Sequence, residues 1–266
     1  PIVCTWHDLN WKHFDVYDAA AKAELEAQAP RWIERASAFV HSSNFIRGEM
    51  QRYYGTPDEV SHVIPLTAET PSAPATDEER AAVRRRFGLP ERFLLSPAGA
   101  HLHKNYPVLD AALRVLRAHG RPIKVVATGE ATDVRYHGPD LLGLGYVSSR
   151  ELQALYEESD GVVQTTLYEA GSWPMWEANV VGKPAAISRI PSVVEQVERL
   201  GTVAELFNPL DPDDVAAALA RVWDGSPATD PQTLAANAAA VASRSWNDVA
   251  SDYLGLFAQL RRGSLV

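Results

Sequence analysis

The sequence is poor in cysteine and has no long apolar run, and these absences exclude whole classes of protein. Cys4 is the only cysteine among 266 residues, which excludes a disulfide-stapled scaffold and favours a cytoplasmic location. No stretch reaches the roughly 18–20 consecutive apolar residues that a membrane helix requires. The formal net charge of −9 repels phosphate backbones, so we expect no nucleic-acid partner.

The composition that remains is that of a folded globular protein. Hydrophobic residues make up 46% and charged residues 22% of the chain, which is typical of an ordered domain rather than a disordered one. The sequence has no signal peptide and no initiator methionine, and it opens on the strand-like run 2–6. We therefore expect it to be part of a longer protein.

Short apolar runs alternate with segments of helical spacing, the pattern of parallel strands joined by crossover helices. The expected strands are 2–6, 38–42, 60–65, 93–96, 123–128, 161–165, 185–188 and 204–207. The expected helices are 18–35, 44–54, 106–119, 149–158, 173–181, 191–200, 215–223 and 247–262, and Thr76, Ser148 and Asp211 are expected to cap helices.

A stretch of small and polar residues interrupted by proline, 67–76, divides this pattern. It predicts a partial α/β unit at 1–66, a linker at 67–76 and a complete α/β domain at 77–244. A terminal helix remains at 245–266. The fold class is α/β, with a doubly wound, Rossmann-like parallel sheet whose ligands bind at the carboxyl ends of the strands.

The loop 97–105 is the first candidate site. Small residues such as Gly99 allow a ligand to approach the backbone, and Lys104 beside a helix N-terminus offers positive charge and N–H donors to an anion. A structural alternative, in which Asn105 caps the helix and Lys104 is solvated, fits this segment equally well. His101 and His103 lack further well-spaced ligands, so solvated histidines are the better interpretation than a metal site.

The segment 165–178 is the second candidate. It carries Glu169 in a loop and, eight residues later, Glu177 in an otherwise apolar helix. Carboxylates accept hydrogen bonds from paired hydroxyls, so two of them across a turn suit a polyhydroxylated ligand such as a sugar or ribose. Between them lie residues with sterically accessible backbone amides: Ala170, Gly171 and Ser172. The alternative is a helix-start acid followed by a surface glutamate.

His7 is the third candidate, because a histidine at a strand end can carry a proton or donate a hydrogen bond. A structural role is the simpler interpretation for His7 taken alone. Other signatures are weak: 143–145 lacks the third glycine of a dinucleotide loop, and 211–213 fits a helix cap better than an Asp-x-Asp metal motif. We expect no metal and no cofactor.

Taken in order, these segments resemble the retaining glycosyltransferases of family four, the group 1 glycosyltransferases, which have the two-domain GT-B fold. Glu169 and Glu177 match the Glu-x7-Glu motif of that family, and 182–184 matches the Gly-Lys/Thr-Pro that follows it. Weaker matches, in the same order as in the family, lie at 6–9, 40–44, 145–148, 208–212 and 245–246. Two departures are 98–99, where the family often has Gly-Arg, and 170–172, where it has Gly-Phe-Gly.

The resemblance implies a role for each domain. Residues 77–244 would bind a nucleotide sugar, and 1–66 would be the remnant of an N-terminal, acceptor-side Rossmann-like domain against which the helix 245–266 packs back. The upstream part of that domain is missing from the chain, so the chain by itself is expected to be inactive.

The resemblance also implies residue roles. Glu177 would hold the ribose, Val147 would pack near the base, and Lys104 would neutralise the diphosphate. Glu169 and the amides after it would grip the donor sugar, which His7 would face across the cleft. The implied catalytic residues are Glu169 and His7, and the implied donor-binding residues are Gly99, Lys104, Val147, Ala170, Gly171, Ser172 and Glu177.

The implied activity is metal-independent transfer of a sugar from a nucleotide-diphosphate donor, with retention, as in bacterial polysaccharide biosynthesis. The acceptor would be a saccharide, a lipid-linked or a small molecule, and peripheral contact with a membrane stays open. A sugar-nucleotide epimerase or a phosphorylase of the same fold, and a non-catalytic nucleotide-binding module, remain alternatives.

Overall fold

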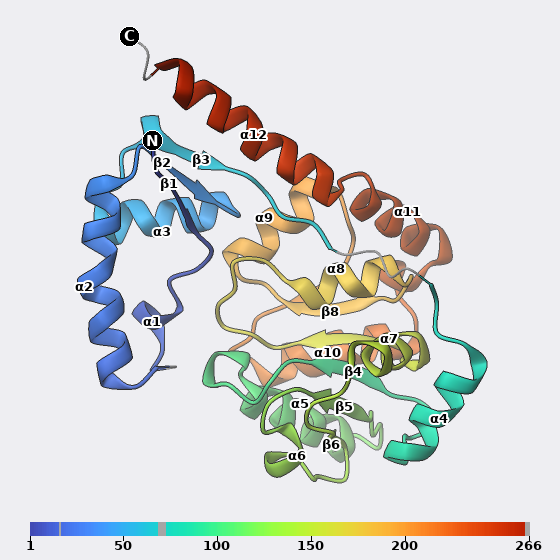
Figure 1. Ribbon diagram of the computed structural model, residues 1–266. Coiled ribbons are helices and arrows are strands. Elements are labelled where there is room, and N and C mark those ends of the chain that lie inside the picture. The colour runs from blue at the N-terminus through green and yellow to red at the C-terminus, as the bar shows by residue number, and fades with distance from the viewer. Residues whose placement is uncertain (16, 69–72, 264–266) are drawn as a thin grey trace.

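The computed structural model describes residues 1–15, 17–68 and 73–263, which form two α/β units (Figure 1). In the smaller, N-terminal unit the described strands are parallel and lie in the order β1-β2-β3. Its elements are β1 (Val3–Trp6), α1 (Asn10–His13), α2 (Ala19–Arg35), β2 (Ala38–His41), α3 (Asn44–Tyr54) and β3 (Ser61–Val63).

The larger, C-terminal unit is a parallel sheet with helices on both faces. Its described strands lie in the order β6-β5-β4-β7-β8-β9, and they are β4 (Leu94–Pro97), β5 (Val125–Thr128), β6 (Leu141–Gly143), β7 (Gly161–Gln164), β8 (Ala185–Ser188) and β9 (Glu205–Phe207). Its helices are α4 (Asp77–Phe87), α5 (Tyr106–Ala118), α6 (Thr132–Arg135), α7 (Ser149–Glu158), α8 (Trp173–Val180), α9 (Pro191–Leu200), α10 (Pro212–Asp224), α11 (Pro231–Ala242) and α12 (Trp246–Gly263). The doubly wound parallel α/β fold predicted from the alternating pattern is confirmed. Among the described helices, none is both long and apolar enough to cross a membrane.

The sequence pattern misses β6 and α6, because each is too short to show a period. The stretch 143–145 is the end of the edge strand β6 and the turn that follows it. The extended segment expected at 60–65 is shorter than predicted, since a 3₁₀ turn occupies Asp58–Val60 and only β3 pairs with its neighbour.

Helix caps fix the helix starts around the larger sheet. Thr76 and Ser148 each form a capping box, and Asp211 accepts hydrogen bonds from two amides at the start of α10, as the sequence predicts for a cap. The alternative in which the Asn105 side chain caps α5 is not found. The side-chain amide of Asn105 donates to the Pro209 carbonyl (2.7 Å), and its backbone has a positive φ of 52°. Asn105 therefore ties the loop after β4 to the segment before α10.

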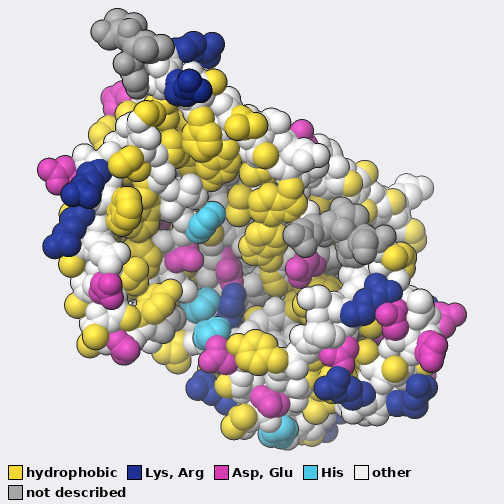
Figure 2. All heavy atoms as spheres, in the orientation of Figure 1, with side chains coloured by type: hydrophobic (Ala, Val, Ile, Leu, Met, Phe, Trp, Pro, Cys, Tyr) yellow, Lys and Arg dark blue, Asp and Glu magenta, His cyan; other side chains and the backbone are white. Residues whose placement is uncertain are grey.

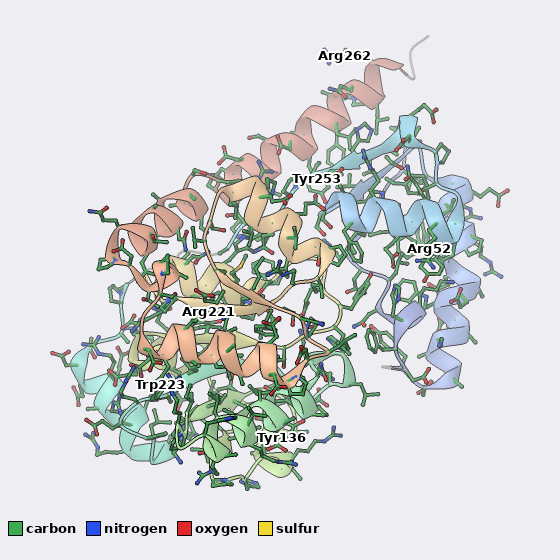
Figure 3. All side chains as sticks on the ribbon, turned by 180° about the vertical axis from the view of Figure 1, so that it is seen from behind. Arg52, Tyr136, Arg221, Trp223, Tyr253 and Arg262 are labelled. Carbon is green, nitrogen blue, oxygen red and sulfur yellow. The ribbon has the colours of Figure 1, made fainter. Side chains whose placement is uncertain are left out.

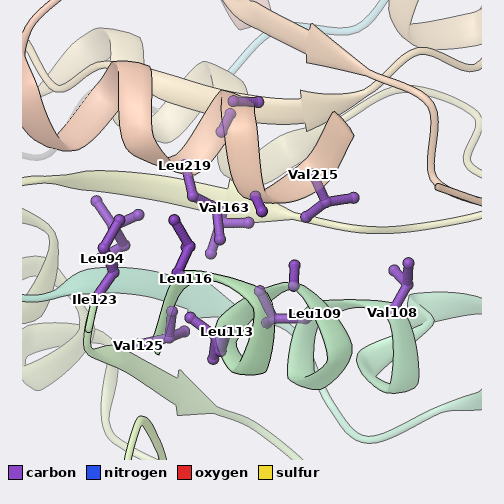
Figure 4. Packing of buried hydrophobic residues seen from close by; sticks show 14 of the residues in the cluster. Leu94, Val108, Leu109, Leu113, Leu116, Ile123, Val125, Val163, Val215 and Leu219 are labelled. Atoms are coloured by element: carbon purple, nitrogen blue, oxygen red, sulfur yellow. The ribbon is translucent and has the colours of Figure 1, made fainter. Parts of the chain in front are cut away.

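One face of the larger sheet is covered by α5 and α10, whose apolar sides meet over the strands (Figure 4). Leu109 and Leu113 of α5 pack in one cluster with Val215 and Leu219 of α10, and all four are buried. The opposite face is covered by α7, α8 and α9 through a second cluster that includes Met175. Because each fully buried side chain of this kind stabilises the fold by about 1.5–3 kcal/mol, the loops at the strand ends start from a rigid frame.

The helix α12 runs from the C-terminal unit over the N-terminal one (Figures 1 and 3). Tyr253, labelled in Figure 3, packs against a cluster that buries Val249 and Leu256 of α12 on the smaller sheet and the chain after it, through Ala38, Val40 and Ile64. The last three residues of the expected helix, 264–266, and part of the expected linker, 69–72, lie outside the described residues.

Gly143 permits a close approach of two backbones, and this can be tested. A Cβ at Gly143 would lie 1.9 Å from the carbonyl oxygen of Thr132, so G143A has to displace β6 or α6. We expect a loss of about 1–3 kcal/mol in the free energy of unfolding, measured by urea denaturation. The matched control is G48A in α3, where a Cβ meets nothing within 4 Å and stability should rise by about 0.5–1 kcal/mol. Equal effects of the two variants would contradict the prediction.

His41, at the end of β2, makes stability dependent on pH. It is fully buried, and neither ring nitrogen has a hydrogen-bond partner among the described residues. Burial, together with the charges of Arg47 and His62, lowers its pKa from 6.5 to about 4. As pH falls through this range, the unfolded chain binds a proton that the folded chain does not, so the free energy of unfolding decreases.

We expect H41L to remove this component of the pH dependence. The component has a slope of at most about 1.4 kcal/mol per pH unit, and urea denaturation at a series of pH values between about 7 and 5 measures it. H119L, at the exposed end of α5, is the control and should keep the slope of the unmodified chain. An H41L slope equal to that of the control would refute the prediction.

Candidate functional site

The candidate site lies where the winding of the larger sheet changes direction. β4 has β5 on one side and β7 on the other, so the chain leaves β4 and β7 toward opposite edges and their following loops separate at the carboxyl end. Ligands of doubly wound sheets bind at this point. The two loops are the predicted candidates 97–105 and 165–172, and they are cross-linked, since the Leu167 amide donates to the His103 carbonyl (2.7 Å).

An ion pair between Lys104 and Glu169 joins the two loops at their tips. Both side chains are largely buried, at 17% and 16% exposure. The Glu169 Oε1 atom also accepts hydrogen bonds from Gln164 Nε2 (3.0 Å) and Thr166 Oγ1 (3.1 Å). All of these donors reach Oε1, and no described residue donates to Oε2. The carboxylate is therefore held by one oxygen, and its other oxygen is available to a ligand.

The bend after Glu169 is held by two glutamine side chains. Gln196 of α9 accepts from the Ser172 amide (2.6 Å) and donates to the Ser172 carbonyl (3.1 Å). The Ser172 hydroxyl donates to Gln164 Oε1 and accepts from the Met175 amide (3.2 Å), which caps α8. Since Ser172 is fully buried, these bonds fix the bend in one conformation.

The bend leaves fewer backbone donors for a ligand than the sequence suggests. The Ser172 amide already donates to Gln196, so a ligand reaches it only by displacing that side chain. The amides of Ala170 and Gly171 have no acceptor among the described residues. The accessible amides of the bend are therefore those of Ala170 and Gly171.

Glu177 lies farther along α8, away from the Lys104–Glu169 pair. It is half-buried and accepts a hydrogen bond from the hydroxyl of Tyr156 on α7. Burial, and the adjacent negative charge of Glu177, raise the pKa of Tyr156 well above its usual value. Tyr156 is therefore a fixed donor that orients the Glu177 carboxylate at the side of the sheet.

The loops after β4, β5 and β6 approach one another closely near Gly99. A Cβ at Gly129 would lie 2.8 Å from the Gly99 amide nitrogen, and the Gly129 amide donates to the Gly145 carbonyl (2.7 Å). Val147 follows in the third loop and packs partly against the core on its face of the sheet. Gly99 and Val147 thus lie on neighbouring loops at the same edge of the sheet.

The two units enclose a cavity of about 410 Å³. In the orientation of Figure 2, histidine and acidic side chains gather in the hollow between the units. His7 lines this cavity together with Glu169, Ala170 and Gly171. The structure therefore brings four of the predicted site residues to one cavity and Lys104 into contact with one of them, whereas Gly99, Val147, Ser172 and Glu177 lie outside the cavity lining.

His103 is not the solvated loop histidine that the sequence analysis expects. It is only 8% exposed, its ring stacks on His101 at a centroid distance of 5.8 Å, and Nδ1 has no partner among the described residues. Burial, with the charges of Lys104 and His101, lowers the pKa of His103 to about 4. The ring is buried because it packs against Phe14 of the N-terminal unit (centroids 6.0 Å apart). Among the described residues, no group of three or more His, Cys, Asp or Glu could hold a metal ion.

Two side chains of the C-terminal unit hold the N-terminal unit in place. Glu195 of α9 accepts hydrogen bonds from the amides of Asn44 (2.7 Å) and Phe45 (2.9 Å), at the start of α3. A carboxylate at a helix N-terminus is favourable because it pairs with unsatisfied N–H groups and the helix dipole. Tyr168 accepts from the Leu9 amide (2.9 Å) across the same boundary. These contacts keep His7 opposite the bend.

The residues that support the site are not evident from the sequence pattern. Gln164 is a buried amide at the end of an otherwise apolar strand, and that mismatch is a signal that the pattern contains. Gln196 and Tyr156 fit ordinary helix positions, and Glu195 fits a surface acid. Their partners are distant in sequence, so periodicity does not reveal their roles.

Comparison with known proteins places the chain in a family. The family model of glycosyl transferases group 1 matches residues 78–240. The chain belongs to the group 1 glycosyltransferases. A relative, the MMP α-(1→4)-mannosyltransferase of Mycolicibacterium hassiacum, is 31% identical over 242 residues, which is 84% of this chain and 57% of that protein. This chain therefore spans little more than half the length of that relative.

Solved structures similar to this group 1 chain have the GT-B fold. The glycosyltransferase from Rickettsia africae has a TM-score of 0.74 at 16% identity, covering 97% of this chain and 70% of that one. Anabaena HepE in complex with UDP and glucose has a TM-score of 0.74 at 16% identity, covering 98% and 71%. WaaG, involved in lipopolysaccharide biosynthesis, has a TM-score of 0.61 at 14% identity, covering 92% and 72%. The predicted GT-B architecture is confirmed.

The role of Gln196 in holding the bend gives a stability prediction. Q196A leaves the buried Ser172 amide and carbonyl without partners, so we expect a loss of about 1–3 kcal/mol in the free energy of unfolding, measured by urea denaturation. The control is Q232A, at an exposed position of α11, where the change should stay within about 0.5 kcal/mol. A Q196A variant as stable as the control would show that the two hydrogen bonds do not hold the bend.

Proposed function

We propose that this protein transfers a sugar from a nucleotide-diphosphate donor to an acceptor, with retention and without a metal ion. The observation that carries the proposal is the Lys104–Glu169 pair beside the amides of Ala170 and Gly171, opposite His7. Cleaving a glycosyl–diphosphate bond develops negative charge on the departing oxygens and positive charge on the sugar. Lys104 supplies a cation beside the departing oxygens, and Glu169 supplies a carboxylate beside the sugar.

The donor would lie along the carboxyl edge of the larger sheet. Glu177, oriented by Tyr156, would accept hydrogen bonds from the ribose hydroxyls, and Val147 would pack against the base. Gly99 would let the diphosphate approach the backbone next to Lys104, which would neutralise it. Lys104 pairs only with Glu169 among the described residues, so its remaining N–H groups can face the phosphates.

The sugar would lie in the cavity between the two units. The free Oε2 of Glu169 and the amides of Ala170 and Gly171 would hold its hydroxyls near the reacting carbon, with Ser172 fixing the bend behind them. His7 would face the sugar from the N-terminal unit. Residues of both units would surround the sugar and exclude part of the water around it, which would favour transfer to an acceptor over hydrolysis.

A hexose is the proposed sugar. The relative from Mycolicibacterium hassiacum is named a mannosyltransferase, and the HepE structure is a complex with UDP and glucose. We take the acceptor to be a saccharide or a lipid-linked or small molecule, and the setting to be bacterial polysaccharide synthesis in the cytoplasm. The metal-independent mechanism is supported by Lys104 and the helix N-termini, which can neutralise a diphosphate without an ion.

Separate changes to the two glutamates test this assignment. E177Q should weaken the binding of UDP or GDP by about tenfold or more, because one charged acceptor for the ribose is lost. E169Q should leave that binding within about threefold, while in the whole protein it should slow sugar transfer by roughly 10²–10³-fold. Isothermal titration calorimetry and the rate of nucleoside diphosphate release from the donor measure the two effects.

The same titrations test whether nucleotide binding requires a divalent metal ion. Binding should be unchanged when EDTA replaces magnesium, and a strict requirement for a divalent ion would refute the metal-independent mechanism. Nucleotide binding that persists in both variants, without any transfer in the whole protein, would instead favour a non-catalytic nucleotide-binding module.

A further inference from the structure

One face of α9 forms a wall of the cavity. Of its four cavity-lining residues, two form the hydrogen bonds to other segments that are described above. Ser192, Glu195, Gln196 and Arg199 line the cavity and are spaced so that they lie on one side of the helix. Gln196 holds the bend and Glu195 holds α3, as described above. Ser192 and Arg199, at the two ends of this face, have no such role.

Two buried hydroxyls in the cavity wall lack hydrogen bonds. Ser192 is 1% exposed, and its Oγ atom has no partner among the described residues. Ser42 Oγ, contributed by the N-terminal unit, is likewise buried and without a described partner. Buried polar groups are nearly always hydrogen-bonded, because leaving one unpaired costs about 1–3 kcal/mol. Both residues line the same cavity, where a polar ligand would supply the missing hydrogen bonds.

Arg199 places an uncompensated positive charge at the same cavity. It forms no ion pair within the described part of the chain. Its pKa is lowered by burial and by the nearby charge of Arg244, and only Glu195 acts in the opposite direction. The Glu195 carboxylate already accepts three hydrogen bonds from Asn44 and Phe45. The Arg199 side chain is exposed, and its guanidinium is available to pair with an anionic ligand.

Trp173 gives the cavity a flat apolar surface. Its ring stacks on Trp246 at 6.2 Å with an interplanar angle of 14° and meets Trp176 edge-on at 5.3 Å. These contacts fix the orientation of the indole, although Trp173 is still 38% exposed. An aromatic face held in this way, next to hydroxyl and guanidinium groups, suits one face of a pyranose ring.

We propose that this part of the cavity is the acceptor subsite and that it takes a saccharide carrying an anionic group, a carboxylate or a phosphate. The ring would lie on Trp173, the anion would pair with Arg199, and the ring hydroxyls would bond to Ser192 and Ser42. The whole cavity has a volume of about 410 Å³, within the range of about 300–1,000 Å³ typical of small-molecule sites, and the acceptor would share it with the donor sugar. The role as acceptor subsite rests on the proposed function, since it places the acceptor next to the sugar held by Glu169.

Binding of matched sugars to the full chain tests this subsite. The probes are glucose, glucuronate and glucose 6-phosphate, each titrated into the chain with and without saturating UDP or GDP and followed by NMR. We expect at least one of the two anionic sugars to bind about tenfold or more tightly than glucose, because a charge-assisted hydrogen bond is gained. The two anionic probes distinguish a carboxylate from a phosphate.

Variants locate the effect. R199Q should abolish the preference for the anionic sugar, whereas R114Q, at an exposed position of α5, should keep it. W173A should weaken the binding of glucose and of the anionic sugar by the same factor, because both sugars contact the indole ring. Equal affinity for all three sugars, or an undiminished anionic preference in R199Q, would overturn the proposal.

The outcome is separable from that of the proposed function. If UDP or GDP binds and depends on Glu177 but no anionic preference is found, the subsite is wrong and the proposed function stands. If the anionic sugar binds through Arg199 but neither nucleotide binds, the saccharide site stands and its role as acceptor subsite of a transferase is overturned.

Discussion

The ion pair between Lys104 and Glu169 is the contact on which the arrangement of the site depends. The two residues are 65 positions apart and meet only because β4 and β7 are neighbours at the point where the sheet changes direction. The pair uses one carboxylate oxygen and leaves the other to the cavity. A cation and an acceptor are thereby placed side by side before any ligand binds, which lowers the cost of ordering them later.

Neutral amide side chains provide the support for this pair. Gln164 hydrogen-bonds to both Glu169 and the Ser172 hydroxyl, and Gln196 hydrogen-bonds to both the amide and the carbonyl of Ser172. Each amide offers a donor and an acceptor, so it can satisfy a buried bend without adding charge that would compete with Lys104. The consequence is a hydrogen-bonded bend in which the amides of Ala170 and Gly171 have no acceptor among the described residues.

The cavity exists because the two units are held together at several places. Glu195 caps α3, Tyr168 binds the Leu9 amide, and α12 packs on the smaller sheet. The face of α9 that carries Glu195 also lines the cavity. A movement between the units would therefore change the distance from His7 to the bend and the shape of the wall that carries Arg199. One helix, α9, thus both lines the cavity and holds the N-terminal unit.

The sequence by itself determined the parallel α/β fold, the helix caps and the loops that carry Lys104, Glu169 and His7, because periodicity and capping are local properties of the chain. Only the tertiary structure decided that His103 is buried against Phe14, that Gln196 accepts a hydrogen bond from the Ser172 amide and that Glu195 accepts hydrogen bonds from the start of α3. These contacts join residues from different elements, and a one-dimensional pattern carries no information on which loops a sheet order brings together. The short edge strand β6 escaped prediction for the opposite reason, since three residues are too few to form a pattern.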